Sequence, residues 1–342
     1  MPTAVVCPDK FRGSLTAVDA TDAMVAGLRR AGFDTVHGIP MADGGEGTLD
    51  ALLAGGGATR TTRVTGPLGD PVDAAWGVLS DGTAIIEMAR ASGLALVGED
   101  NDALRASTRG TGELIADAIG RGAPRVLVGV GGSATTDGGL GAVTALGWAL
   151  SGVPVTIACD VTTHFVDAAE VFGPQKGATR AQVALLRRRL ERLADEYLER
   201  TGVDVRPLDG GGAAGGLAGG LAAIGAVLES GFDVVADATG LADLIEGADL
   251  VVTGEGHLDA SSLGGKVVGG VLALSADLGV PARAVICGDC VASSAEEVSV
   301  AHGRAPLTLR DRAWDLDDAQ ARAALLAEEA AVELGTSVLS GR

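Results

Sequence analysis

The sequence has few aromatic residues, few cations and few cysteines. Only 3% of its 342 residues are aromatic, so the core must be built from Ala, Val, Leu and Ile, which suits a parallel sheet covered by helices. The 26 Lys and Arg stand against 45 Asp and Glu, and this excess of acid argues against a nucleic-acid partner. Four scattered cysteines cannot form a disulfide framework, so we expect free thiols and a cytoplasmic protein.

Long apolar runs are also missing. No uninterrupted apolar stretch reaches the length of a membrane span, and the N-terminus has neither the charged region nor the apolar region of a secretory signal. We therefore expect no membrane partner. The chain is long enough for two domains, and a ligand cleft between two domains is our starting expectation.

Glycine, in contrast, is abundant, with 53 residues, and it gathers in loops that also carry acids. The stretch 41–48 places Asp43 and Glu46 among three glycines. Glycine lets a backbone approach a bound anion, and carboxylates are the ligands that Mg²⁺ takes beside phosphates. A flexible acidic turn is the alternative interpretation of this stretch.

Similar loops follow several predicted strands, at the sheet edge where open α/β folds bind ligands. The strand at 3–7 leads to Asp9, Lys10 and Arg12; the strand at 125–130 leads to Gly131, Gly132, Ser133 and Asp137; the strand at 153–159 leads to Asp160; and the strand at 248–253 leads to Glu255 and Asp259. Gln175 and Lys176 lie just before a helix that Thr179 caps, and Lys266 lies in a further glycine loop.

Helices are predicted by caps and apolar periodicity. Thr16 with Asp19 forms a capping box for a helix that ends at Gly32, and Thr179 opens a long helix with an apolar stripe. We expect a closing helix over 316–334 and a short strand over 234–236.

Two kinds of chemistry, dinucleotide-dependent redox chemistry and phosphoryl transfer, are compatible with the glycine loops. Residues 129–134 match the dinucleotide pattern G-x-G-x-x-G/A, which would indicate an oxidoreductase, but the acid expected about twenty residues later is missing. Cys287 and Cys290 have a C-x-x-C spacing that could indicate redox chemistry. Phosphoryl transfer fits better, because it needs backbone amides, a cation and Mg²⁺-binding carboxylates, and these recur from loop to loop.

Nine stretches of the chain resemble, in order, the signature blocks of the type I glycerate kinase family. They are residues 7–15, 40–48, 64–69, 110–113, 129–139, 158–161, 171–178, 212–220 and 253–259. The resemblance implies an α/β fold of two domains, one a flavodoxin- or Rossmann-like parallel sheet and the other a mixed α/β domain resembling the restriction-endonuclease fold. We expect the first to comprise residues 1–62 and 225–342 and the second to be inserted as residues 63–224, with the active site in a cleft between them.

The resemblance also implies the chemistry. It predicts phosphorylation of D-glycerate by ATP with Mg²⁺, with 2-phosphoglycerate favoured over 3-phosphoglycerate as product, and a homodimer is one expected assembly. A kinase for another small hydroxy acid and an inactive relative that binds a sugar acid or nucleotide are the alternatives. The chain departs from the family pattern at Arg12, where Lys is usual, at Thr136, where Asn is usual, in a shortened stretch at 147–153, and at Thr162-Thr163-His164.

We assign the candidate residues to three roles. The predicted catalytic residues are Asp43, Asp160, Lys10 and Arg12. The residues predicted to bind substrate or phosphate are Asp9, Gly44, Gly45, Glu46, Gly131, Gly132, Ser133, Asp137, Gln175, Lys176 and Lys266. The metal ligands are Glu255 and Asp259, joined by Asp43 or Asp160.

Overall fold

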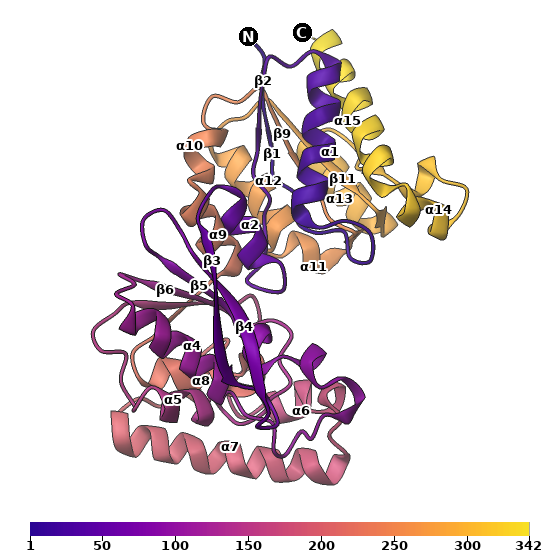
Figure 1. Ribbon diagram of the computed structural model, residues 1–342. Coiled ribbons are helices and arrows are strands. Elements are labelled where there is room, and N and C mark those ends of the chain that lie inside the picture. Colours follow the sequence, from indigo (N-terminus) through magenta and orange to yellow (C-terminus); the bar gives the residue numbers. More distant parts are fainter. Residues whose placement is uncertain (342) are drawn as a thin grey trace. The chain divides into compact units, whose positions relative to one another are not determined.

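The computed structural model describes residues 1–341 (Figure 1). The chain forms two compact units. The first unit contains Met1–Asp43, Asp50–Gly55 and Val235–Arg342, and the second contains Gly44–Leu49 and Gly56–Val234. Both contain parallel strands and helices, so the predicted α/β class is confirmed. The predicted domain boundaries at 62 and 225 stay predictions.

The first unit is built on a five-stranded sheet in which every pair of neighbours is parallel. Its order is β13 (Leu307–Thr308), β11 (Ala282–Cys287), β9 (Leu250–Thr253), β1 (Thr3–Val6) and β2 (Thr35–Gly38). Counted along the chain within this sheet, the order is 2-1-3-4-5, which is that of flavodoxin-like folds. The order reverses between β1 and β9, so a ligand is expected at the carboxyl ends of these two strands.

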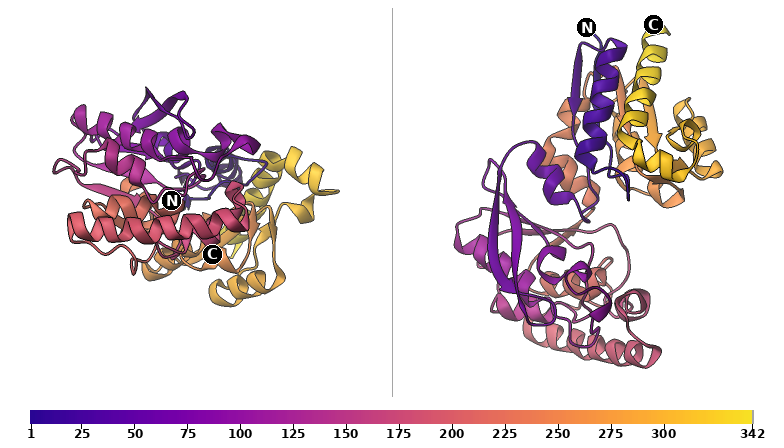
Figure 2. Two further views of the ribbon diagram at one scale, coloured as in Figure 1. Left: turned by 90° about the horizontal axis from the view of Figure 1, so that it is seen from below. Right: turned by 45° about the vertical axis from the view of Figure 1, so that its right-hand side comes forward.

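Helices cover both faces of this sheet. On one face α1 (Ala17–Ala31) and α15 (Ala323–Ser340) lie side by side (Figures 1 and 2) and pack on Ala284 and Ile286 of β11. The alternate residues Val285 and Cys287 face α12 (Val267–Asp277) and α13 (Ala292–His302). The period of two along β11 therefore gives the strand two buried faces, as a central strand requires.

The predicted start and end of the first helix are confirmed. The Thr16 side chain accepts a hydrogen bond from the Asp19 amide, and α1 ends at Gly32, whose φ of 108° is left-handed. The predicted closing helix divides into α14 (Leu316–Ala321) and α15, with Arg322 between them.

The predicted strand over 234–236 is wrong, because these residues belong to α9 (Gly231–Thr239), a helix that begins in the second unit and ends in the first. Three apolar residues in a row cannot distinguish a buried strand from a turn of a buried helix. The remaining elements of the first unit are α2 (Thr48–Ala54), which begins in the second unit, α10 (Leu241–Ile245), β10 (His257–Leu258), α11 (Ala260–Leu263), β12 (Asp289–Cys290) and η4 (Arg310–Arg312).

The second unit is built on a mixed sheet of six strands in chain order. The strands are β3 (Ala58–Thr65), β4 (Pro71–Val78), β5 (Ala84–Glu87), β6 (Val126–Gly129), β7 (Val155–Ala158) and β8 (Val227–Glu229). β3, β4 and β5 pair antiparallel, and β5 to β8 pair parallel. The carboxyl ends of β5, β6 and β7 thus lie along one edge of the sheet, where the candidate loops begin.

Helices of the second unit form two apolar cores. α4 (Arg109–Gly120), α5 (Leu140–Ala145) and α8 (Ala213–Ala223) contribute to a core with the sheet around Trp76. α7 (Arg180–Thr201), the long pink helix in Figure 1, and α6 (Ala168–Phe172) form the other core around Phe165 and Tyr197. The shorter helices are α3 (Ala89–Ser92), η1 (Leu94–Leu96), η2 (Gly98–Asp100) and η3 (Pro174–Lys176).

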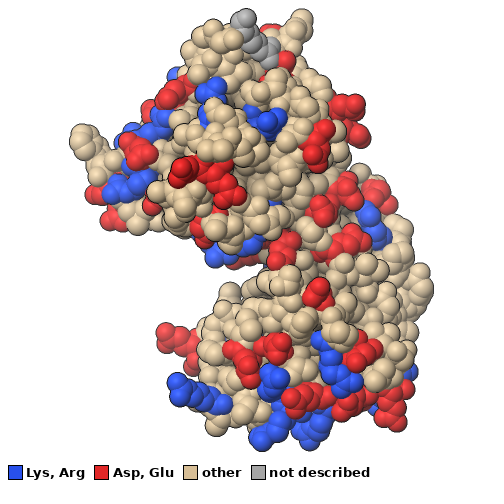
Figure 3. All heavy atoms as spheres, turned by 180° about the vertical axis from the view of Figure 1, so that it is seen from behind, with Lys and Arg blue, Asp and Glu red and all other residues tan. Residues whose placement is uncertain are grey.

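The surface carries both positively and negatively charged side chains. On the face in Figure 3, Lys and Arg side chains lie among Asp and Glu side chains. Within residues 1–341, none of the helices combines the length and the apolar character needed to cross a membrane.

Candidate active site

Three loops of the first unit meet at the carboxyl ends of β1, β2 and β9. The Asp9 amide donates to the Gly254 carbonyl at 2.8 Å, and the Met41 amide donates to the Pro8 carbonyl at 2.9 Å. A Cβ on Gly256 would lie 2.8 Å from the backbone nitrogen of Arg12, so only glycine allows these loops to pack so closely. The topology therefore brings the predicted residues of three loops to one switch point.

Lys10 lies between two carboxylates at this point. Its Nζ is 3.7 Å from Oδ1 of Asp9 and 3.9 Å from Oδ1 of Asp43, and all three side chains are largely buried, between 14% and 23% exposed. Burial raises the pKa of the Asp9 carboxyl; the Lys10 ammonium opposes this shift, and the Asp43 carboxylate adds to it. The positive charge of Arg12, an exposed residue, also lowers the Asp9 pKa.

Glu255 adds a third carboxyl group. Its Oε1 is buried and accepts no hydrogen bond from the described residues. Burial raises the pKa of Glu255, and the carboxylates of Asp9 and Asp259 raise it further, against the Ser262 hydroxyl and Lys266. A buried carboxyl oxygen without a donor is costly, which fits a site that binds a cation.

Asp259 and Lys266 lie near Glu255, but the local backbone occupies Asp259. Oδ1 of Asp259 accepts hydrogen bonds from the amides of Ser261 at 2.7 Å and Ser262 at 3.3 Å, which caps α11. Hydrogen bonds from Ser261 lower the Asp259 pKa. Among residues 1–341, no group of three or more His, Cys, Asp and Glu side chains is arranged to hold a metal. Mg²⁺ that binds with substrate phosphates needs only one or two protein carboxylates, so Glu255 fits such an ion.

In the second unit, the glycine loop at 44–48 packs on the carboxyl ends of β6 and β7. A Cβ on Gly44 would lie 2.7 Å from the Ala158 carbonyl oxygen, and one on Gly131 would lie 2.7 Å from Cα of Gly45. A Cβ on Gly129 would lie 2.6 Å from the Gly44 carbonyl oxygen. These glycines are therefore required for backbone packing, a role that the sequence interpretation did not foresee. Glu46 lies exposed on the same loop.

Lys176 lies buried inside the loop at 131–137. Its Nζ is 3.3 Å from the Ser133 hydroxyl and donates to the Thr135 carbonyl, and the side chain is 3% exposed. Burial lowers the pKa of Lys176 to about 7, and the nearby Asp137 carboxylate opposes the shift. Both Lys176 and Ser133 thus hold the loop from within.

Asp137 braces the same loop against two helices. Its Oδ2 accepts hydrogen bonds from the Thr108 amide at 2.8 Å and the Gly141 amide at 3.2 Å. Gly132, with φ of 72°, turns the chain, and its carbonyl accepts from the Leu94 amide. The loop is therefore rigidly held at several points, as a ligand-binding loop benefits from being.

The two remaining predicted residues differ in setting. Asp160 follows β7, and its Oδ1 accepts a hydrogen bond from the Gly231 amide at 2.7 Å, which ties the loop to α9. Gln175 lies exposed in η3.

Glu87 is a residue that the sequence analysis missed. It ends β5, is 3% exposed, and accepts hydrogen bonds on Oε1 from the amides of Gly47 at 2.9 Å and Leu49 at 3.0 Å. Its Oε2 accepts from Nε of Arg90 at 2.8 Å. An acid that closes the otherwise apolar strand Ala84–Glu87 is the same signal that selected Asp160, so the sequence did contain the clue.

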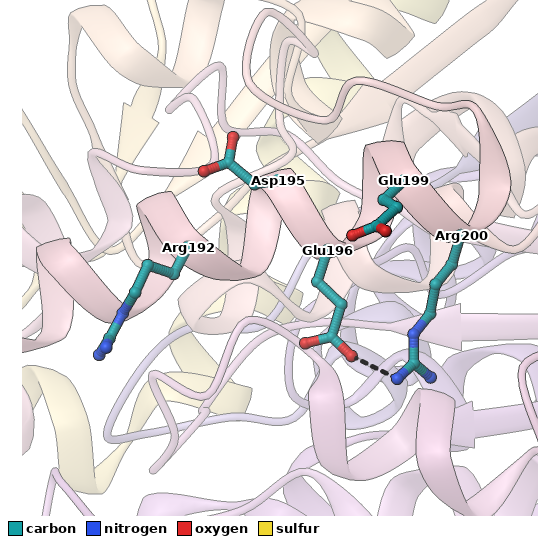
Figure 4. Close-up of a pocket in the computed structure, with 5 residues that line it drawn as sticks. All are labelled: Arg192, Asp195, Glu196, Glu199 and Arg200. Carbon is teal, nitrogen blue, oxygen red and sulfur yellow. Dashed lines mark ion pairs between the residues drawn. The ribbon is translucent and has the colours of Figure 1, made fainter.

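A hollow on the outer face of α7 has a different character (Figure 4). Its lining consists of Arg192, Asp195, Glu196, Glu199 and Arg200, and Glu196 pairs with Arg200 at 2.9 Å. These side chains all come from one helix, and Arg200 also stacks on the ring of Trp148 at 4.2 Å. The hollow is a charged helix surface and does not join the candidate site.

A doubly wound sheet with paired carboxylates and a lysine at its switch point defines an α/β enzyme that handles a small charged ligand. The family model of the glycerate kinase family matches residues 4–152 and 148–339. The chain is 41% identical over 305 residues to the glycerate 2-kinase of Escherichia coli K12, which covers 78% of this chain and 80% of the relative. It is 39% identical to a glycerate kinase of Halalkalibacterium halodurans, with 97% of each chain covered.

A comparison with solved structures also supports the glycerate kinase family. The crystal structure of a Salmonella typhimurium LT2 protein described as a glycerate kinase 2 superposes with a TM-score of 0.83, at 34% identity and with 99% of each chain covered. The chain belongs to the glycerate kinase family. The predicted family and the predicted kinase class are confirmed, and the dinucleotide-dependent oxidoreductase alternative is dropped.

Proposed function

We propose that the protein transfers the γ-phosphoryl group of ATP to the 2-hydroxyl of D-glycerate. The observation that carries the proposal is the placement of Lys10 between Asp9 and Asp43 at the switch point of the parallel sheet. The name of the E. coli relative, a glycerate 2-kinase, supports the 2-hydroxyl over the 3-hydroxyl as acceptor. ATP is the co-substrate expected of a kinase family.

The bond changes are those of phosphoryl transfer. The acceptor hydroxyl oxygen bonds to the γ-phosphorus, the bond from that phosphorus to the bridging oxygen breaks, and ADP leaves with the electron pair. In our proposal Asp43 orients the hydroxyl and takes its proton. Lys10 and Arg12 supply positive charge for the glycerate carboxylate and for the transferred oxygens. Asp9 holds the Lys10 ammonium in place.

Magnesium and the glycine loops complete the proposal. Bound Mg²⁺ would neutralise phosphate charge, and Glu255 is the residue we propose to hold it, because its buried Oε1 has no donor. Asp259 and Asp160 stay candidate ligands, although each accepts backbone hydrogen bonds. The phosphate and substrate contacts that we propose come from Gly44, Gly45, Glu46, Gly131, Gly132, Ser133, Asp137, Gln175, Lys176 and Lys266.

We also propose a cytoplasmic enzyme, because Cys7, Cys159, Cys287 and Cys290 are all free thiols. A homodimer is our working proposal for its assembly. Sedimentation equilibrium at micromolar concentration tests it, and a molar mass of one chain would contradict it.

The test of function is direct. The protein is incubated with ATP, Mg²⁺ and D-glycerate, and the product is followed by phosphorus NMR, which separates 2-phosphoglycerate from 3-phosphoglycerate. We expect the 2-phosphate. A signal from the 3-phosphate would overturn the acceptor assignment, and turnover with other hydroxy acids but not with glycerate would favour a kinase of different acceptor specificity.

A further inference from the structure

We propose that Glu87 is a positioning residue, which holds the segment at 47–49 and thereby sets the loop that carries Asp43. This inference rests on the proposed function of Asp43. Glu87 would act without touching either substrate, through the backbone that it binds.

The geometry of Glu87 is that of a buried anchor. Its carboxylate makes three hydrogen bonds: Oε1 accepts from the Gly47 and Leu49 amides, and Oε2 accepts from Nε of Arg90. The side chain is almost wholly buried, so these bonds lie in a medium of low dielectric constant. A charged acceptor forms stronger hydrogen bonds to backbone amides than a neutral one, and Arg90 offsets the cost of burying its charge.

The anchor is fixed to a rigid element. Glu87 pairs with Gly129 in the parallel β5–β6 ladder, and the next amide, that of Met88, donates to the Gly129 carbonyl at 2.9 Å. Within the segment that Glu87 holds, Gly47 has a φ of 96° and nothing lies within 4 Å of the position of a Cβ there, whereas Leu49 is 2% exposed at the start of α2. A rigid strand thus adds a restraint to the loop that leads into α2, and functional loops are commonly fixed in this way.

Asp43 is close to this anchor along the chain. Only four residue steps separate Asp43 from Gly47, a reach of at most about 14 Å, and two of the intervening residues are Gly44 and Gly45. At its other end the loop is held by the hydrogen bond from the Met41 amide to Pro8. The chain after Asp43 is therefore restrained by the packing of Gly44 on Ala158 and by the hydrogen bonds of Glu87, and loss of the Glu87 anchor would remove the second of these restraints.

The first experiment compares Glu87→Gln with wild type and with Asp117→Asn. Asp117 is a matched control in the same unit, since it also accepts from a neutral donor, the Thr62 hydroxyl, and from an arginine, Arg121. We expect Glu87→Gln to lower kcat about 10- to 100-fold with KM for ATP changed less than about threefold, because misplacement by an ångström can cost that much. Asp117→Asn should leave kcat within about twofold. Equal losses of kcat in the two variants, or none in Glu87→Gln, would overturn the proposal.

The second experiment asks whether Glu87 acts through Asp43. Glu87→Gln is introduced into Asp43→Asn, and the kcat values are compared in a double-mutant cycle. If Glu87 positions Asp43, Glu87→Gln should change kcat less than about twofold in that background. If Glu87→Gln lowers kcat by the same factor in both backgrounds, Glu87 does not act through Asp43. Two other results would show that the proposed function itself is wrong. The first is wild-type protein that forms no phosphoglycerate, and the second is an Asp43→Asn variant that keeps full turnover.

Hydrogen exchange supplies a readout that does not depend on activity. Amides at 47–49 should exchange at least tenfold faster in Glu87→Gln, while those of β1 and β9 keep the wild-type rate. Unchanged exchange at 47–49 would contradict the anchor. If Glu87→Gln does not fold, Glu87→Asp is used for all three measurements with the same criteria, because its side chain is one methylene shorter and its carboxylate is withdrawn from the Gly47 and Leu49 amides.

Discussion

The Nζ of Lys10 lies 3.9 Å from Oδ1 of Asp43, although one residue follows β1 and the other follows β2. The distance is too long for a hydrogen bond but short enough for Coulombic attraction at a largely buried site. An ammonium held in this way is available to an incoming anion. A carboxylate or phosphate could therefore compete with Asp43 for the Lys10 ammonium.

Replacing Lys10 by Met should strongly impair turnover. We expect kcat to fall about 100- to 1,000-fold, because the variant loses a cation placed for the charge of the transition state. Initial rates of ADP formation at saturating substrates measure the effect. Arg30→Met is the control: Arg30 forms a surface ion pair with Glu328 in the same unit, and its loss should leave kcat unchanged. A Lys10→Met enzyme with near wild-type kcat would remove Lys10 from the mechanism.

Replacing Asp9 by Asn should stabilise the fold while it slows the reaction. Since the Asp9 pKa is raised in the folded state, the ionised carboxyl destabilises the protein at pH values above that pKa. The gain in melting temperature should therefore be full near pH 7, should shrink as pH falls through the raised pKa, and should vanish below the unfolded value of about 4. Thermal melts between pH 3 and 7.5 test this. A loss of stability at pH 7 would show that attraction to Lys10 outweighs burial.

Lys176 should make stability depend on pH in the alkaline range. Its pKa is lowered to about 7, so between that pH and the unfolded value of about 10.5 the unfolded chain binds more protons than the folded one. Stability relative to Lys176→Met should then rise with pH above 7, by up to about 1.4 kcal/mol per pH unit. Urea unfolding of both proteins at pH 6.5, 7.5, 8.5 and 9.5 measures the difference. A difference that stays constant with pH would mean that Lys176 does not titrate in this range.

Gly44 and Gly47 should respond differently to alanine, although both have positive φ. A Cβ on Gly44 would meet the Ala158 backbone at 2.7 Å, whereas nothing lies within 4 Å of one on Gly47. Gly47→Ala should cost only the backbone strain of about 1–2 kcal/mol, and Gly44→Ala should cost about 1–3 kcal/mol more from overpacking. Equilibrium unfolding in urea gives both values. Equal costs would show that the loop at 44–48 can move away from β7.

The sequence predicted the elements whose signals are local. The cap at Thr16, the stop at Gly32 and the long helix after Thr179 are all present, because caps and apolar stripes act within a few residues. The loops that carry Asp9 and Glu255 were correctly assigned to strand ends. That these two acids lie together depends on β1 pairing with β9, which are distant in sequence, and only the topological rule for parallel sheets could indicate it.

The features that were missed depend on tertiary contact. The helix at Gly231–Thr239 contains too short an apolar run for its period to be read. The packing role of Gly44 and Gly131 depends on two backbones that meet in space, which a glycine count cannot reveal. Glu87 acts on amides of a segment that precedes its own strand by a full hairpin, so its partners could not be inferred from its neighbours in sequence.

The pairing of β1 with β9 and the packing of α1 against α15 also bear on synthesis of the chain. The first strand and helix leave the ribosome long before their partners, whereas the second unit is nearly continuous, with Gly56–Val234 as its main part. Because domains fold as units when their residues are available, the second unit can fold first while the N-terminal segment waits. Within residues 1–43, β1 can pair with β2 early, but the edge of β1 that pairs with β9 and the face of α1 that packs on α15 stay uncovered until those elements have been synthesised.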